Sequence, residues 1–416
     1  MRIIAFSLIL AATSAIAAET SDEDALSIAD KAPSSTEHAG NWHSFIEGAI
    51  GQIGQRTGNQ YLETQRLSLD IAYDAFIAPK WRAVFADRLD MFGQDQTEGR
   101  RNINTLKEAY LNWHASQDQL FDLGRINARY GVGTGYNPTD FFRGGALRSV
   151  TSADPNSLRK NRLGSVMLRS QTLWTQGSLT ALYSPKLDSE QSNTPFNADL
   201  GATNDRNRWL LSLSHQFSEN INPQWSLYGE EHGSPQLGFN LSSLLNDATV
   251  GYIEWSGGRS RSLLSQALNG SDDTAFRSRL STGITYTTEN KITLTLEAQH
   301  SNAGLGNAEW DALGRGPRPT YQLYRKFAND RQDLPTKREV FLYATWDDAL
   351  INNLSINALA RLNLSDYSRM TWLESRYHLD HADLALQWQM NTGSATSAYG
   401  AATQQRILQG VVTYFF

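Results

Sequence analysis

The sequence predicts an all-β fold: a transmembrane antiparallel β-barrel of a Gram-negative outer membrane, with about 18 strands, or about 16 as the second choice. Three observations predict it. The first residues have the pattern of a secretory signal. Most of the remaining chain alternates apolar and polar side chains with a period of two. The last residues, Leu408 to Phe416, alternate in the same way up to a terminal Phe.

The secretory signal is predicted over residues 1–17. The positive Arg2 precedes an apolar run from Ile3 to Ala12, and Ala15-Ile16-Ala17 matches the rule for signal cleavage. We therefore expect the mature chain to begin near Ala18. An uncleaved membrane anchor is the alternative interpretation, but the apolar run is too short to span a bilayer comfortably.

Two regions follow the signal. Residues 18–41 are polar and acidic, and we expect them to form a periplasmic N-terminal extension. Residues 42–416 are expected to form one transmembrane barrel, because no second domain boundary appears in them. After the signal, no stretch approaches the roughly 18 apolar residues that a membrane helix needs.

The composition excludes several classes of protein. The chain of 416 residues has no cysteine, which excludes a disulfide framework, a thiolate metal site and a cysteine nucleophile. Its net charge of -6 at pH 7 argues against nonspecific nucleic-acid binding. A P-loop and a dinucleotide fingerprint are absent, and we expect no cofactor and no metal. The stretch before the first strand is too short for the plug of an active TonB-dependent transporter.

Features besides the alternation separate a lipid-embedded barrel from a soluble β-sandwich. Leu384, Leu386 and Trp388, for example, alternate with Ala385 and Gln387. A sandwich also alternates, but here the polar face carries ionisable groups in mid-strand, which a solid core would not accept unpaired. The connectors also alternate between short and long, and aromatic residues gather near strand ends, as interfacial girdles require.

The predicted strands share a length of about ten residues. In chain order they are 42–54, 62–76, 80–92, 103–114, 118–130, 162–174, 177–185, 206–217, 222–231, 236–244, 248–257, 274–287, 291–301, 337–346, 352–363, 368–377, 383–392 and 405–416. The long connectors between them are 93–102, 131–161, 186–205, 258–273, 302–336 and 393–404. Both ends of the barrel fall on the side of the short turns, as a barrel tethered in the periplasm requires.

The final strand carries a signal of its own. Tyr414 and Phe416 share one face, and a terminal Phe with an aromatic residue two positions earlier resembles the sorting signal read by the barrel assembly machinery. An ordinary C-terminal edge strand is the alternative. We expect this strand to pair with the segment that begins near Trp42, because that pairing removes both sheet edges.

The lumen face is predicted to carry charges of both signs. The residues that we predict to line the pore or its constriction are Arg66, Arg82, Arg88, Glu108, Arg125, Arg129, Asp140, Arg143, Arg148, Arg169, Glu254 and Glu297. A ring of arginines would favour anions. The alternative is that these ions pair with one another and only keep the lumen wet. Asp87 falls on the lipid side by parity, so a bulge or a different register is expected there.

Two adjacent segments resemble proteobacterial outer-membrane porin-like families. Glu108-Ala109-Tyr110-Leu111 precedes Leu123-Gly124-Arg125, and a glycine-rich stretch then leads to Asn137-Pro138-Thr139-Asp140. In those families an EAYL strand forms a hairpin with an LGR strand that runs into a glycine-rich NP-x-D loop. The resemblance implies a passive or substrate-selective channel of about this strand number and does not identify the solute.

The loop at 131–161 is expected to fold inward and form the constriction, because its glycines permit a tight path and its arginines would meet anionic solutes. An extracellular cap that touches no solute is the alternative. The arginine-rich loop at 302–336 is a second candidate lid. The predicted function is a porin or channel for passive diffusion or export of small polar solutes, with anion preference as an open option.

Two other functions compete with the channel. An outer-membrane hydrolase would need a serine and histidine constellation, but the histidines are scattered and no serine lies in a nucleophile-elbow sequence. His300 near Ser301, and His232 near Glu230, are the only spots that suggest one. We therefore predict no enzyme and no catalytic residue. A non-conducting structural or adhesin barrel has the same period of two and stays an alternative.

The expected partners follow from the predicted location. They are outer-membrane lipid and lipopolysaccharide, the barrel assembly machinery during biogenesis, and small polar solutes. No nucleic acid is expected. A homo-oligomer is an open option, because alternation alone cannot separate a subunit contact from a lipid-facing wall.

Overall fold

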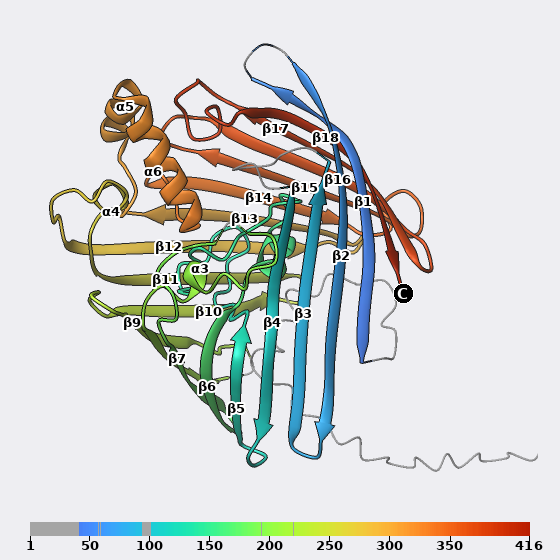
Figure 1. The fold of residues 1–416 in the computed structure, drawn as a ribbon, viewed down its shortest axis with the longest axis vertical. Helices are drawn as coiled ribbons and strands as arrows, with labels where there is room; N and C mark the ends of the chain where they lie inside the picture. The colour runs from blue at the N-terminus through green and yellow to red at the C-terminus, as the bar shows by residue number, and fades with distance from the viewer. Residues whose placement is uncertain (1–40, 57, 59, 94–100, 193, 219) are drawn as a thin grey trace, which may run out of the picture. The chain divides into compact units, whose positions relative to one another are not determined.

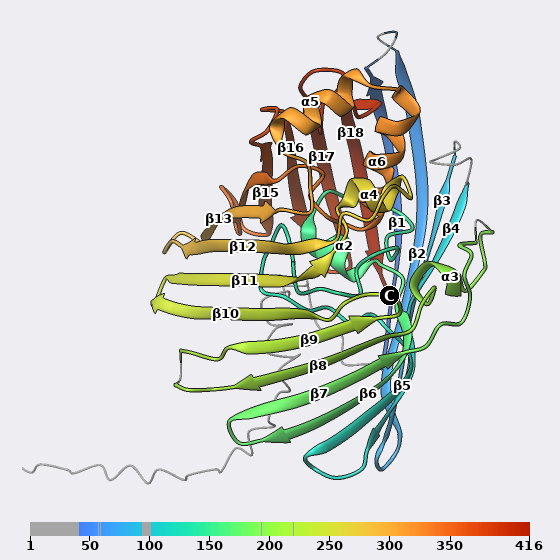
Figure 2. The same cartoon turned by 90° about the vertical axis from the view of Figure 1, so that its left-hand side faces the viewer.

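The computed structural model describes residues 41–416 except 57, 59, 94–100, 193 and 219. The predicted signal at 1–17 and nearly all of the predicted extension at 18–41 therefore lie outside the described residues. The described part is an antiparallel sheet of 18 strands in which each strand pairs with the next along the chain (Figures 1 and 2). Among the described residues, no helix is long and apolar enough to cross a membrane.

The strands have the following bounds: β1 (Trp42–Gln55), β2 (Tyr61–Ala78), β3 (Trp81–Phe92), β4 (Asn102–His114), β5 (Gln119–Ile126), β6 (Ser165–Trp174), β7 (Gly177–Ser184), β8 (Arg208–His215), β9 (Gln224–Glu230), β10 (Gln236–Asn246), β11 (Thr249–Ser260), β12 (Ala275–Thr287), β13 (Ile292–Ser301), β14 (Arg338–Trp346), β15 (Leu354–Asn363), β16 (Arg369–His378), β17 (Ala382–Thr392) and β18 (Gln404–Phe415). The helices, all in long connectors, are α2 (Pro155–Lys160), α3 (Leu200–Thr203), α4 (Leu263–Ala267), α5 (Asn307–Arg315) and α6 (Arg318–Asp330).

The barrel closes between its first and last strands. β1 and β18 pair antiparallel from Phe45 opposite Phe415 to Gln55 opposite Gln404. This pairing leaves neither terminal strand as a free edge, which a sheet in lipid requires. The fold class and the first-choice strand number are therefore confirmed. We call the end with the hairpin turns the short-turn end, and the opposite end the long-loop end.

The two faces of the strands differ as the alternation predicts. In β8, Trp209, Leu211 and Leu213 are exposed on the outer face, whereas Ser212 and Ser214 are buried on the inner face. Side chains alternate between faces along a strand. An apolar exposed surface is stable in lipid, so the outer face fits a hydrocarbon environment.

Two local expectations need correction. The strand predicted to end at 130 ends at Ile126, because the chain turns inward there and Arg162 binds Asn127 Oδ1 and Ala128 O, each at 2.8 Å. The irregularity near Asp87 is observed, but the extra residue lies on the partner strand: Ala86 faces Glu108 and Asp87 faces Leu106.

The bulge therefore does not move Asp87 to the lumen. Asp87 stays on the face that also carries the exposed Phe85, and it is only half-buried. Its carboxylate accepts a hydrogen bond of 3.0 Å from Asn104 Nδ2 on β4. A polar partner on the neighbouring strand satisfies part of the carboxylate's need for hydrogen bonds, and no change of register in β3 is required.

Candidate permeation pathway

The connector between β5 and β6, residues 127–164, folds inside the barrel, and we call it the inward loop. Figures 1 and 2 show it, in teal and green, running within the ring of strands. Its Tyr130 and Phe142 are buried in an apolar cluster with Leu182, Leu210 and Tyr228 from the inner face of β7 to β9. The apolar packing explains why strands that should line a wet lumen carry Leu182 and Leu210 on their inner face.

The glycine-rich tip of the inward loop is held by a carboxylate on the far wall. Glu254 of β11 is fully buried and accepts hydrogen bonds from the backbone N–H groups of Val132 and Gly133, at 2.9 Å each, and of Thr139, at 2.7 Å. Gly131 has a φ of 100°, and a Cβ there would lie 2.4 Å from Glu254 Oε1. Glycine is therefore required at this position, both for the backbone conformation and for the close approach.

A second carboxylate binds the next two residues of the tip. Glu297 of β13 is also fully buried and accepts hydrogen bonds from the N–H groups of Thr134, at 2.8 Å, and Gly135, at 3.1 Å. The hydroxyl of Tyr252 donates to the same oxygen at 2.6 Å. Both carboxylates were predicted to line the pore, but the structure places them beneath the inward loop, where they bind backbone amides.

The tip also reaches β15. Arg361 donates to the carbonyl oxygen of Gly135 at 2.8 Å and to Glu339 at 3.0 Å. The expected inward path of the loop is thus observed: it starts at β5, packs on β6 to β9 and binds β11, β13 and β15. A segment held on two facing walls narrows the lumen.

The predicted Asp140 and Arg143 also stabilise the inward loop. Arg162 and Asp140, both buried within the loop, form an ion pair of 2.7 Å. Burial lowers the pKa of Arg162, although Asp140 opposes this shift. Arg143 donates to the carbonyl oxygens of Asn137 and, at 3.3 Å, of Arg331. Arg331 follows α6, so Arg143 joins the inward loop to the long connector at 302–337.

A second link between these two connectors involves Asp333. The hydroxyl of Tyr136 donates to Asp333 Oδ1 at 2.5 Å, and Arg279 Nε of β12 donates to Oδ2 at 2.7 Å. Burial alone would raise the pKa of Asp333, but the charges of Arg279 and Arg143 and the two hydrogen bonds outweigh it and lower the pKa. Burial and the neighbouring carboxylate raise the pKa of Tyr136. We call Tyr136, Asp333 and Arg279 the loop clamp.

The predicted Arg66 and Arg88 lie in a charge network on β1 to β4. Arg66 pairs with Glu47 at 2.5 Å, and Arg88 pairs with Glu47 and with Asp90 at 2.9 Å each. On the same wall, Lys107 Nζ lies 2.7 Å from Asp70. Three cations thus face three carboxylates. This wall matches the alternative weighed above, in which the ions pair and keep the lumen polar.

The remaining predicted residues are also engaged in contacts. Arg125 donates to the carbonyl oxygens of Gly164, at 2.8 Å, and Ala198, at 2.6 Å. Arg169 pairs with Asp122 at 2.5 Å. The structure places the others as follows: Arg82 beside Asp74 near the β2–β3 turn, Arg148 donating at 3.0 Å to the carbonyl of Asn197, Glu108 half-buried at the β4 bulge, and Arg129 half-buried in the inward loop.

A cavity of about 520 Å³ lies at the long-loop end, and we call it the polar vestibule. The cavity is lined by the inward loop, the segment 202–208, the ends of β9 to β12, α4, and the end of α6 with the residues after it. Its arginines are Arg143, Arg206, Arg208, Arg259, Arg261, Arg279 and Arg331. Its acids are Asp140, Asp205, Glu230, Asp272, Asp330 and Asp333. The alternation along the strands did not predict most of these residues, because they come from loops and strand ends.

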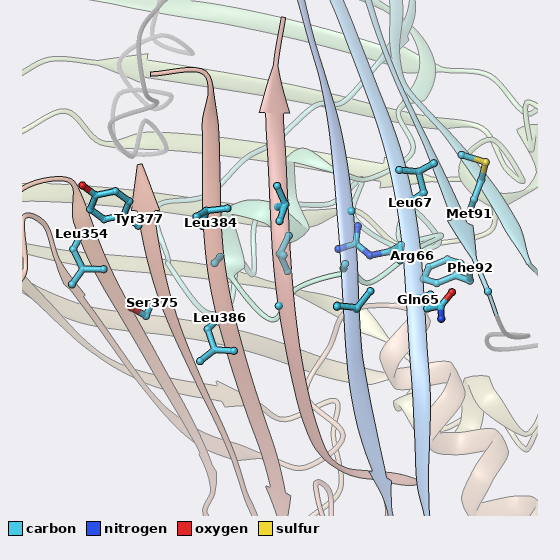
Figure 3. A pocket seen from close by; sticks show the side chains of 18 residues that line it. Gln65, Arg66, Leu67, Met91, Phe92, Leu354, Ser375, Tyr377, Leu384 and Leu386 are labelled. Carbon is cyan, nitrogen blue, oxygen red and sulfur yellow. The ribbon is translucent and has the colours of Figure 1, made fainter. Parts of the chain in front are cut away.

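A larger groove of about 960 Å³ lies on the outer face (Figure 3). It follows one row of residues paired from strand to strand: Leu354, Tyr377, Leu384, Val412, Gly48, Leu67 and Met91. A Cβ at Gly48 or Gly410 would have no atom within 4 Å, so these glycines leave the surface hollow. The groove is mostly apolar and does not belong to the permeation pathway.

Within the described ranges, the structure does not place a serine and a carboxylate around either of the two histidines named from the sequence in the arrangement of a catalytic triad. His232 is exposed and lies 3.4 Å from Glu231. His300 pairs in register with Arg338 of β14. Among the described residues, no group of three or more histidine, aspartate or glutamate side chains could hold a metal ion.

Neither a protein-family model nor a curated protein sequence matches the chain. Solved structures share its fold. A BenF-like porin from Pseudomonas fluorescens Pf-5 superposes with a TM-score of 0.57 at 10% identity, over 90% of this chain and 98% of that one. OccAB1 from Acinetobacter baumannii superposes with a TM-score of 0.56 at 10% identity, over 90% of this chain and 96% of that one. OccD3 (OpdP) from Pseudomonas aeruginosa superposes with a TM-score of 0.51 at 12% identity, over 92% of this chain and 93% of that one.

Proposed function

We propose that this chain is an outer-membrane porin through which small polar solutes diffuse passively. The observation that carries the proposal is the combination of a closed barrel, apolar outside and charged inside, with a loop that narrows the lumen. A barrel of this strand number has room for an aqueous channel. The fold shared with a BenF-like porin supports the same function.

The anion preference is proposed for the polar vestibule rather than for the strand walls. On the wall of β1 to β4, Arg66 and Arg88 are neutralised by carboxylates. In the vestibule, by contrast, Arg208 donates to a backbone carbonyl, and Arg261 donates to Ser265 and to the carbonyl of Gly270. Within the described residues, no carboxylate lies at ion-pair distance from Arg208, Arg259 or Arg261. Arg208 is buried, so the charge available to an incoming anion is that of Arg259 and Arg261.

Single-channel recording in planar bilayers with a KCl gradient tests both parts of the proposal. We expect discrete conductance steps and a reversal potential that indicates anion preference. The double variant Arg259→Gln/Arg261→Gln should move the reversal potential toward the value expected for a cation-selective channel. The matched control is the charge-neutral double variant Arg82→Gln/Asp74→Asn, which removes both members of an ion pair near a short turn, and it should leave the potential unchanged.

Two outcomes would count against the proposal. A cation-selective wild-type channel would refute the anion preference but leave the channel standing. A folded protein without conductance would refute the channel and favour a non-conducting structural barrel. The apolar packing of the inward loop on β7 to β9 is the observation that favours that second function.

The remaining expectations concern the location of the chain in the outer membrane and its partners there. Lipid and lipopolysaccharide would surround the exposed apolar face, and the barrel assembly machinery would insert the chain. Whether the barrel forms a homo-oligomer is open, and cross-linking in isolated membranes would decide it. Recovery of the chain in the inner-membrane or soluble fraction would contradict the proposed location.

A further inference from the structure

Three side chains at the short-turn end lie in line across neighbouring strands. Ser355 is the second residue of β15, His378 is the last residue of β16, and Asp383 is the second residue of β17. Ser355 Oγ lies 3.3 Å from His378 Nε2, and His378 Nδ1 lies 2.9 Å from Asp383 Oδ1. A hydroxyl, an imidazole and a carboxylate in this order form the arrangement of a serine-hydrolase triad, which is recognised by geometry and not by chain order.

The three side chains face the lumen. Leu354 and Tyr377 lie on the outer groove (Figure 3), and Ser355 and His378 follow them directly, so they have the opposite orientation. Asp383 precedes the exposed Leu384 and is buried. A solute in this end of the lumen can therefore reach the site, whereas lipid cannot.

The exposures match the roles that the chemistry requires. The side chain of His378 is 27% exposed, and that of Asp383 is 7% exposed. Asp383 also accepts a hydrogen bond of 3.2 Å from Arg376 Nη1, which orients its side chain. An N–H at Nδ1 that donates to Asp383 leaves the lone pair of Nε2 pointing toward Ser355. The distance of 3.3 Å is within the range found in ligand-free sites.

Two further side chains, Arg376 and Asp347, lie close to Ser355. Arg376 is the register partner of Ser355, so the Cβ atoms of the two lie about 5 Å apart on the same face. Its guanidinium is held by Glu374 at 3.0 Å and can stabilise negative charge that develops next to Ser355. Asp347 Oδ1 lies 3.2 Å from Ser355 Oγ and competes with His378 for the hydroxyl proton.

We propose that Ser355, His378 and Asp383 form a hydrolytic site for small carboxylic esters that enter this end of the lumen. Ser355 Oγ attacks the ester carbonyl carbon while its proton moves to His378 Nε2. The C–O bond to the alcohol then breaks, and the alcohol leaves with that proton. A water molecule, deprotonated by His378, attacks the acyl-serine, the carboxylic acid is released, and the proton returns to Ser355.

An active-site label tests the proposal on the folded full-length chain in detergent. A fluorophosphonate probe should attach to Ser355, as located by peptide mass mapping, and the protein should hydrolyse p-nitrophenyl acetate. Ser355→Ala should abolish both. The matched control is Ser375→Ala, on the neighbouring strand but lining the outer groove, and it should keep both at the wild-type level.

The role of Asp383 beside His378 is tested by Asp383→Asn, which keeps the shape of the side chain but removes its charge. We expect it to lower the rate of Ser355 labelling by about 100-fold or more. The heat-modifiable mobility of the folded form, measured on every variant, reports folding independently of ester hydrolysis and of conductance. Absence of label on Ser355 in a folded protein, or hydrolysis that persists in Ser355→Ala, would overturn the proposal and leave the porin function untouched.

Discussion

At the residue scale, the two buried carboxylates Glu254 and Glu297 bind backbone amides of the inward loop. Glu254 accepts three backbone N–H groups and Glu297 accepts two. Hydrogen bonds to a charged group contribute about 1.5–3 kcal/mol each. These residues therefore determine where the loop lies, and the loop in turn determines how wide the lumen is. Their effect on a solute is indirect.

Asp333 in the loop clamp predicts a pH dependence. Its pKa is lowered below the usual value of 3.8 by Arg279, Arg143 and its hydrogen bonds. A depressed pKa means that the clamp has its full strength above pH 3.8 and loses it as the pH falls through the still lower value in the folded protein. Channel noise should therefore stay constant from neutral pH to about pH 4 and rise in stronger acid.

A substitution provides the comparison for this prediction. Asp333→Asn removes the charge at every pH, so its channel should be noisy already at neutral pH. The exposed Asp311 on α5 supplies the control, because Asp311→Asn should behave like the wild type. Equal noise of Asp333→Asn and wild type at neutral pH would show that the clamp does not hold the loop.

At the element scale, the wall formed by β1 to β4 is a balanced charge network. Glu47 pairs with both Arg66 and Arg88, and the network joins three cations (Arg66, Arg88 and Lys107) to three carboxylates (Glu47, Asp70 and Asp90). Such a wall orders water without selecting strongly for either sign of ion. In the proposed channel, ion selectivity would then depend on the loops at its mouth more than on the strands.

Arg66→Ala tests the balance of the wall. The substitution leaves one carboxylate in excess, so the reversal potential in a KCl gradient should move toward cations. We also expect a loss of about 1–3 kcal/mol in stability, because Glu47 loses a charged partner. The double variant Arg66→Ala/Glu47→Gln restores the balance and should return the potential toward that of the wild type. A single variant with unchanged selectivity would place this wall away from the ion path.

At the scale of the whole molecule, closure depends on the pairing of β18 with β1. The N–H of Phe416 donates to the carbonyl of Ser44 at 3.1 Å, and its exposed ring packs edge-on against Tyr414 at 5.2 Å. The ring therefore lies outside the lumen. We therefore expect it to contribute to insertion and assembly and not to the passage of ions.

Phe416→Ala should therefore reduce the amount of folded barrel in the outer membrane but leave the conductance of each assembled channel unchanged. The heat-modifiable mobility of the folded form measures the first quantity, and single-channel recording measures the second. Phe76→Ala removes another exposed aromatic ring, near the β2–β3 turn, and should assemble normally. Equal assembly of the two variants would contradict a signal at the C-terminus.

The barrel itself could be predicted from the sequence because its pattern is local. The side chains of each strand alternate with a period of two, and Leu384, Leu386 and Trp388 face outward as the pattern predicts. Counting strands between turns leads to the observed number and to the closing pair. Boundaries were less exact, as at Ile126, because the turn into the lumen depends on Arg162, which is distant in the sequence.

The sequence by itself determined that this chain forms an antiparallel barrel, apolar outside and polar inside, and which residues face each side. Only the tertiary structure decided what the inward-facing residues do. Glu254 meets Val132 across the lumen, 122 positions away, and His378 meets Ser355 and Asp383 only because three strands lie in register. The physical reason is that periodicity specifies the direction of a side chain, whereas its partner depends on how distant segments pack.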